Sequence, residues 1–289
     1  MRRAEEGLLM LTCALGQAVQ PLTPAEYRYL SERVHRFLRI DPEQELTTEH
    51  LLSIGYRMSE AERIVALLDR EDALHRYLES EDVGIMTRLD PKYPQGLRRL
   101  NHAPLVLFYK GERALFDSRC VALVGARKAS EASIRFAARI GELAAKEGFT
   151  LVSGGAVGAD QAAQRACLKA GGRVICFVPD ALKRYQTMPN VLFCSDEGFD
   201  CEFSASRALR RNHFIHAMGE KVFVAACLKP SGGTWSGTSY NLNHNLCEVY
   251  VFDDGMAGTA ALLRRNCTAV DESLHSIADL MPEQLSIFD

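Results

Sequence analysis

Residues 120–125 (CVALVG) and 149–155 (FTLVSGG) decide the fold, because each is a short apolar run that ends in glycine. Runs of the same kind recur at 173–179 (RVICFVP), 190–195 (NVLFCS), 221–226 (KVFVAA) and 248–253 (EVYVFD). Helical windows separate these runs. Unbroken apolar strands that alternate with helices predict a parallel sheet, because the helices of βαβ crossovers bury both of its faces.

The predicted class is therefore α/β, with a Rossmann-like, doubly wound and mostly parallel sheet over residues 119–270. A small helical domain over 1–85 and a connecting segment over 86–118, which ends in one added strand, precede it. Residues 271–289 are expected to form a tail. Ligands of such a sheet bind outside the carboxyl ends of its strands, where helix N-termini point.

The first 85 residues show helical periodicity. In residues 25–40 (AEYRYLSERVHRFLRI), apolar side chains recur every three or four positions. A second helical pattern, residues 46–71, breaks at Gly55 and is expected to restart with Ser59 as N-cap and Glu62 completing a capping box. The result resembles a SAM-like or helix-hairpin-helix-like module, which contacts nucleic acid or a partner in some proteins and only packs in others.

Composition limits the classes of function. The formal net charge of -3 argues against indiscriminate polyanion binding, so any nucleic-acid site must be a local patch. The nine cysteines contain no CxxC pair and are expected to be free thiols in a reducing compartment. No apolar run approaches the length that a bilayer requires, so we expect a cytoplasmic protein without membrane contact.

The first strand is followed by Gly125, Arg127 and Lys128, immediately before a predicted helix. Amides at the helix start, together with the two cations, predict a corner that holds a phosphate. Arginine also suits stacking under a base. A solvated turn is the alternative interpretation, and no dinucleotide GxGxxG motif is present.

The second strand leads into a glycine-rich turn. Its candidate residues are Ser153, Gly154, Gly155, Gly158 and Asp160. The glycines allow an anion to approach the backbone closely, since no Cβ stands in the way. Asp160 has the alternative role of a helix cap.

Further candidates for the same sheet edge carry cationic, amide or hydroxyl groups. They are Lys183, Arg210, Arg211, Asn212, Ser231, Gly232 and Gly233. His213 and His216 have the spacing of some metal pairs but lack an obvious carboxylate or thiol companion, so we expect polar packing and neither metal nor cofactor.

Several of these segments together resemble the DprA/Smf family. They are YPQGLRRLNHAPLVLFYKGE (93–112), CVALVGARKAS (120–130), FTLVSGGAVGADQAA (149–163), RVICFVPDALKRY (173–185) and RALRRNHFI (207–215). The resemblance covers about residues 90–240. It implies a non-enzymatic, dimeric protein that binds single-stranded DNA in a basic pocket and loads a RecA-type recombinase in DNA uptake or recombination. The family motif positions fall on Gly125, Arg127, Ser153, Gly154, Gly158, Asp160, Arg211, Asn212, Ser231 and Gly232.

The chain departs from the family pattern in three places. Gln164 stands where the family usually has histidine, the turn at 231–238 (SGGTWSGT) is unusual, and the sequence after Asn241 takes a different course, without the winged-helix tail of many members. These departures bear on the recombinase partnership and the dimer more than on the anion pocket.

Two other functions share the superfamily's fold. A nucleoside-monophosphate phosphoribohydrolase would need the glutamate of a PGGxGTxxE loop, but no acidic residue lies between Thr234 and Glu248. A nucleotide-binding sensor would use the same phosphate-holding turns and would saturate on one nucleotide, whereas strand binding tightens with oligonucleotide length.

The sequence QLSIF near the end of the chain suggests a third role, as an adaptor. Gln284, Leu285, Ile287 and Phe288 resemble the short motif by which bacterial replication proteins dock on the sliding clamp. The alternative is an ordinary tail that folds back on the core.

Overall fold

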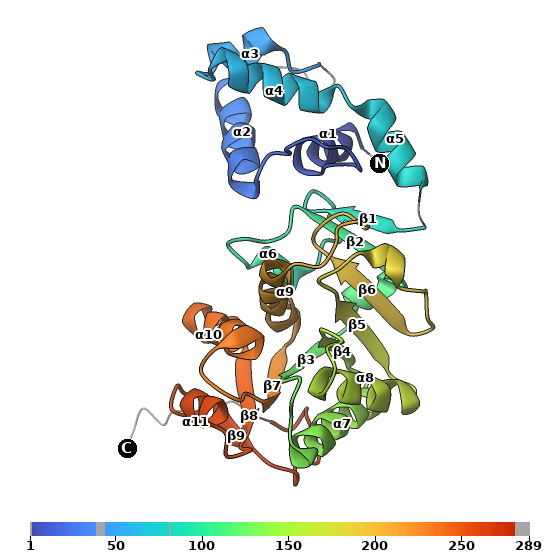
Figure 1. Ribbon diagram of the computed structural model, residues 1–289, viewed down its shortest axis with the longest axis vertical. Coiled ribbons are helices and arrows are strands. Elements are labelled where there is room, and N and C mark those ends of the chain that lie inside the picture. Colours follow the sequence, from blue (N-terminus) through green and yellow to red (C-terminus); the bar gives the residue numbers. More distant parts are fainter. Residues whose placement is uncertain (1, 39–43, 81, 281–289) are drawn as a thin grey trace.

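The computed structural model describes residues 2–38, 44–80 and 82–280. Its centre is a nine-stranded sheet in the order β1-β2-β6-β5-β4-β3-β7-β8-β9 (Figure 1). The β1–β2 and β2–β6 pairs are antiparallel, and the other pairs are parallel. This sheet confirms the expected α/β class and its Rossmann-like, mostly parallel topology.

The strands follow the apolar runs of the sequence. Their bounds are β1 Gly84–Thr87, β2 Val106–Gly111, β3 Cys120–Gly125, β4 Thr150–Ser153, β5 Arg173–Phe177, β6 Val191–Ser195, β7 Lys221–Ala226, β8 Glu248–Phe252 and β9 Thr268–Val270. The connecting segment therefore contributes to two strands of the sheet, where the sequence predicted one. The boundaries of the four predicted parts stay a prediction.

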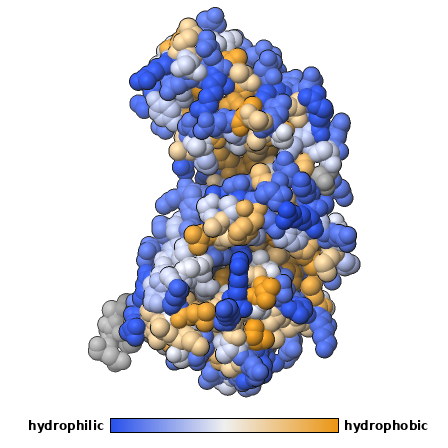
Figure 2. All heavy atoms as spheres, in the orientation of Figure 1, coloured by the Kyte–Doolittle hydropathy of each residue, from blue (hydrophilic) through white to orange (hydrophobic). Residues whose placement is uncertain are grey.

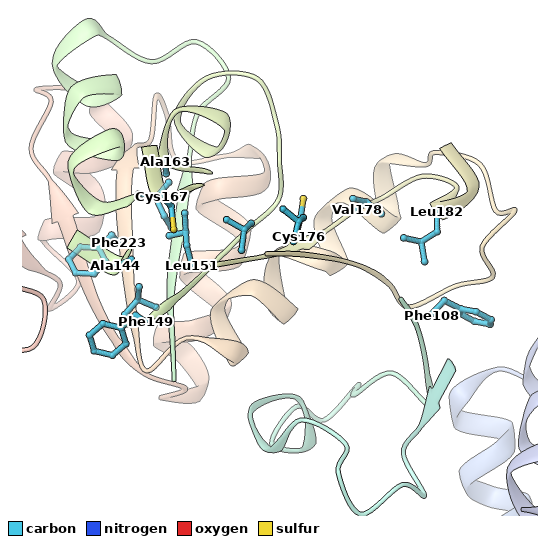
Figure 3. Packing of buried hydrophobic residues seen from close by; sticks show 14 of the residues in the cluster. Phe108, Ala144, Phe149, Leu151, Ala163, Cys167, Cys176, Val178, Leu182 and Phe223 are labelled. Atoms are coloured by element: carbon cyan, nitrogen blue, oxygen red, sulfur yellow. The ribbon is translucent and has the colours of Figure 1, made fainter. Parts of the chain in front are cut away.

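Helices cover both faces of the sheet. Those of the sheet domain are α6 Gln95–Arg98, α7 Glu131–Lys146, α8 Ala159–Lys169, α9 Ala205–Met218, α10 Gly232–His244 and α11 Ala257–Leu263, with the 3-10 helices η1 Arg113–Asp117 and η2 Leu182–Arg184. Side chains alternate along β3: Val121 and Leu123 enter the core under α7 and α8, and Ala122 and Val124 enter the core under α9. Figure 3 shows part of the first of these cores.

The chain reverses its direction across the sheet after β6. From β3 the strands add outward as β4, β5 and β6, and α9 then returns the chain so that β7 pairs with the free side of β3. Such a reversal opens a crevice at the carboxyl ends of the two central strands, because the helices that follow them lie on opposite faces. The turns that follow β3 and β7 lie at this reversal.

Five helices precede the sheet: α1 Arg3–Thr12, α2 Pro24–Phe37, α3 Thr48–Ser53, α4 Met58–Leu68 and α5 Glu71–Glu79. Leu8 and Leu9 of α1 belong to the same buried cluster as Phe108 of β2. Tyr77 of α5 stacks on Phe199 with 4.2 Å between ring centroids, and its hydroxyl donates to Asp200 at 2.8 Å. The helical module is thus packed on the edge of the sheet.

The start of α4 corrects a prediction. The helix has Arg57 as N-cap, and the Arg57 amide donates to the Glu60 carboxylate at 3.0 Å, so Ser59 and Glu62 do not form the capping box. The reason is the tight turn before it: Gly55 has a φ of 90°, and the Tyr56 amide already bonds back to Leu51.

None of the helices in the described ranges combines the length and apolar character needed to cross a bilayer. The clamp-like residues Gln284, Leu285, Ile287 and Phe288 lie outside the described residues.

Candidate nucleic-acid interface

Three turns meet at the carboxyl ends of neighbouring strands. The first turn (126–130) follows β3, the second turn (154–158) follows β4, and the third turn (227–231) follows β7. The Ala126 amide donates to the Ala226 carbonyl at 3.0 Å, which joins the first turn to the end of β7. Gly158, with a φ of 101°, passes so close to the first turn that an added Cβ would lie 2.6 Å from the Arg127 carbonyl oxygen. The first two turns and the end of β7 therefore form one continuous edge. Residues 231–238, which the sequence analysis expected to be a turn, instead begin helix α10, whose N-cap is Ser231.

Three cations on this edge are exposed and unpaired. In the described ranges, the side chains of Arg127, Lys128 and Lys229 make no hydrogen bond or ion pair. Lys229, in the third turn, was missed by the sequence analysis because a single lysine outside any motif carries no signal of its own. Lys183 is also exposed, in η2 beyond β5, and contacts Phe199 only through its backbone amide.

Arg211 packs against the second turn. Its side chain is nine-tenths buried, and its Nη1 is 3.7 Å from Oδ2 of Asp160. Its Nε has no hydrogen-bond partner among the described residues. The guanidinium occupies the space above Gly154, where an added Cβ would come within 1.1 Å of Nη1. Gly154 is thus required so that Arg211 can reach this position.

Asp160 shapes the second turn and neutralises Arg211. Its Oδ2 accepts the amides of Gly154 at 3.2 Å and Ala156 at 3.4 Å. Burial raises the pKa of this carboxyl, and Arg211 and the turn amides oppose that shift. The carboxylate therefore faces inward, toward the amides of the second turn and Arg211. Asp160 positions the turn and does not face an anionic ligand.

Ser153 and Gly155 also act from within the turn. The Ser153 hydroxyl is buried and accepts a hydrogen bond of 2.6 Å from Nε2 of Gln164, the residue that departs from the family pattern. Gly155 has a φ of 68°, and an added Cβ would lie 2.9 Å from the Cys176 thiol. Both residues fix the path of the backbone.

The third turn ends at a helix start with unsatisfied amides. Ser231 is the N-cap of α10 but makes no side-chain capping bond, and no acidic residue stands in the first turn of the helix. The Asn212 side chain of α9 is more than nine-tenths buried and has no hydrogen bond within the described chain. Its Nδ2 lies 2.6 Å from where a Cβ of Gly233 would be. Together with the amide of Gly232, these donors are suited to binding an anion.

Arg210 is engaged elsewhere. Its Nε donates to Asp196 at 2.5 Å, and its Nη2 pairs with Glu197. Neighbouring Arg207 is buried and donates to the Ser195 hydroxyl at 2.8 Å. The two carboxylates neutralise Arg210. The sequence analysis expected Arg210 to add positive charge to the edge, but in the structure its charge is paired elsewhere.

Exposed apolar side chains lie beside the free cations on the same edge. Val157 of the second turn is 66% exposed, Leu228 of the third turn is 38% exposed, and Met256 before α11 is 39% exposed. Figure 2 shows hydrophobic residues in separate patches among hydrophilic ones on the visible face. Cations interleaved with apolar contacts suit a ligand that carries both phosphates and bases.

The described residues of this edge do not form a metal centre. Within residues 2–38, 44–80 and 82–280, no three His, Cys, Asp or Glu side chains are grouped as metal ligands. His216 instead accepts from Asn241 Nδ2 through its Nδ1 at 3.2 Å, and His213 contacts His102 at 3.0 Å.

Solved structures share the fold. The structure of DNA processing protein A from Streptococcus pneumoniae superposes with a TM-score of 0.74 at 23% identity, covering 94% of this chain and 95% of that one. That of DNA processing protein A from Helicobacter pylori, a protein described with a single-stranded DNA binding mode, gives 0.56 at 22% identity and covers 65% of this chain and 90% of that one.

Curated relatives carry the same names. The chain is 34% identical to DNA processing protein DprA of Streptococcus pneumoniae over 123 residues, 40% of this chain and 43% of that protein. It is 23% identical to DprA of Bacillus subtilis over 272 residues, 86% of this chain and 90% of that one. It spans only 25% of the length of Synechocystis protein Smf, at 35% identity and over 34% of this chain. A family model described as DNA recombination-mediator protein A matches residues 84–281. The chain therefore belongs to the DNA recombination-mediator protein A family, also called DprA/Smf.

Proposed function

We propose that this protein binds single-stranded DNA along the carboxyl edge of its sheet, as a DNA-processing protein of DprA type. The observation that carries the proposal is the set of unpaired cations Arg127, Lys128 and Lys229 beside the uncapped start of α10. Free guanidinium and ammonium groups and unsatisfied amides bind phosphate, whereas a protein of net charge -3 binds polyanions only where such groups are concentrated.

A strand fits this edge better than a single nucleotide. The donors extend from the second turn across the first turn to Asn212 and Gly233, and Val157 and Leu228 offer apolar contacts for bases along the same edge. The Helicobacter pylori relative, described as binding single-stranded DNA, supports the same choice.

A binding role is proposed in place of catalysis. The phosphoribohydrolase alternative needs the glutamate of a PGGxGTxxE loop, and no acidic residue lies between Thr234 and Glu248. Asp160 is turned inward to Arg211 and the second turn, so it is not placed to act as a general base on a bound ligand.

The protein's partners are proposed from the family and from the sequence. A RecA-type recombinase and a second copy of this chain follow from membership of the family. The sliding clamp follows from residues 284–288 alone.

Fluorescence anisotropy with labelled oligonucleotides of about 5 to about 30 nucleotides, at about 50 and about 200 mM salt, tests the proposal. We expect affinity to rise with length, to be higher for single than for double strands and to fall steeply with salt. Saturation by a mononucleotide, without further gain from longer strands, would assign the edge to a nucleotide sensor instead.

A further inference from the structure

Helix α10 presents a surface without charged side chains. From Ser231 to Asn245 the sequence contains no Lys, Arg, Asp or Glu, although a quarter of the whole chain is charged. Gly237, Thr238 and Asn241 are buried, while Trp235, Tyr240 and His244 are half-buried or exposed. A surface without carboxylates does not repel a polyanion, and its aromatic rings can stack on bases.

Three aromatic rings are stacked in order along this surface. His213 of α9 lies on Tyr240 with 4.1 Å between ring centroids and 11° between planes, and Tyr240 lies on His244 at 4.0 Å and 20°. His102 holds the column in place through Nδ1 of His213 at 3.0 Å and the Tyr240 hydroxyl at 3.3 Å. His244, at the end of the column, is exposed.

The column is electrically neutral at its buried end. Burial lowers the pKa of His213 to about 4, and burial together with nearby Arg210 lowers the pKa of His102. Neutral stacked rings offer a π face to another planar ring, and an aromatic stack of this kind accepts any nucleobase.

Cations border the surface. Arg265 donates to Ser239 at 2.7 Å and to Asn243 at 2.8 Å, and its guanidinium lies 5.5 Å from the Trp235 ring centroid. Lys229 precedes the helix, and Arg99 donates to the Leu246 carbonyl at 3.1 Å just beyond its end. None of the hydrogen bonds that α10 side chains make within the described residues involves a carboxylate. The charge around the helix therefore favours a polyanion.

We propose that the α10 surface, from Trp235 to His244, carries a single strand onward from the phosphate-binding edge, with a base stacked on the exposed ring of His244. The inference rests on the proposed function, because it continues the same strand. The helix of 13 residues is about 20 Å long, which corresponds to about five or six stacked nucleotides. A strand held at Lys229 and Gly233 thus needs several further nucleotides to reach His244.

The test compares two oligothymidylates, of about 4 and about 15 nucleotides, in binding to His244→Ala, His244→Phe and the unchanged protein. We expect His244→Ala to weaken the long strand about five- to tenfold and to leave the short one unchanged, and His244→Phe to restore the long strand, because a ring is sufficient for stacking. His275→Ala removes an exposed histidine elsewhere and serves as the control.

Photo-crosslinking adds a direct readout. A long strand with iodouracil at successive positions should form adducts with the peptide that contains Tyr240 and His244. If His244→Ala bound the long strand as tightly as the unchanged protein does, with adducts confined to the three turns, the α10 path would be overturned while the edge itself still binds DNA. Failure of both strands to bind the unchanged protein would instead reject the proposed function.

Discussion

The guanidinium group of Arg211 lies directly over the Cα of Gly154, so that a Cβ there would come within 1.1 Å of Nη1 and 2.0 Å of Cζ. Gly154→Ala should therefore push Arg211 away from Asp160 and lower the free energy of unfolding by about 1–3 kcal/mol. Urea denaturation measures this change.

A double-mutant cycle isolates that contact. In the Arg211→Ala background the added methyl group has room, so Gly154→Ala should then cost little further stability. Additive losses in the double variant would show that the methyl group disturbs the backbone of the second turn rather than Arg211.

Arg127→Ala should weaken single-strand binding about tenfold at low salt, because a charge-assisted contact to phosphate is lost. The slope of log affinity against log salt should fall by about 0.7, the value of one phosphate contact on a single strand. Anisotropy titrations at several salt concentrations measure both quantities.

The matched control is Arg119→Ala. Arg119 is an exposed arginine at the opposite end of β3, where it pairs with Glu220 at 2.8 Å. The Arg119→Ala variant should bind DNA as tightly as the unchanged protein does. If the two arginine variants weakened binding equally, the loss would reflect net charge and not a site at Arg127.

The central strands and the meeting of their turns could be predicted, because these strands are buried on both faces and so appear as unbroken apolar runs. The edge strands β1 and β9 are only partly buried and give no such signal. The separate roles of Arg210 and Arg211 could not be predicted. The two residues are adjacent in sequence but lie on different sides of α9, and their partners, Asp196 and Asp160, come from distant segments. The start of α4 was misplaced because a turn closed by Gly55 set the helix earlier than the local capping pattern suggested.

Arg210→Ala should change stability and leave DNA binding within about twofold. Burial raises the pKa of Asp196, and Arg210 opposes that rise. Without Arg210 the pKa rises further, and the buried carboxylate becomes more costly at any pH where it is ionised. The variant should therefore lose more stability at neutral pH than at lower pH, where uptake of a proton by Asp196 removes the unpaired charge. An equal loss at both pH values, or DNA binding as weak as that of Arg127→Ala, would contradict this assignment.

His216 should make the fold sensitive to acid. The side chain is fully buried, its Nδ1 accepts from Asn241, and burial lowers its pKa to about 3. Because the folded pKa lies below the unfolded value of about 6.5, the unfolded chain binds an extra proton between the two values. Stability from His216 is therefore complete above about pH 6.5 and declines as pH falls toward the folded pKa.

His216→Gln keeps an acceptor for Asn241 but cannot titrate. As the pH falls, the unfolding free energy of the variant should decrease less steeply than that of the unchanged protein. The two slopes should differ by up to about 1.4 kcal/mol per pH unit between roughly pH 6 and pH 4. His213 titrates over part of the same range, so some slope should remain in the variant. Denaturation curves at several pH values measure the difference, with His275→Gln, at an exposed position, as control. Parallel pH profiles for His216→Gln and the unchanged protein would mean that protonation of His216 does not limit stability in acid.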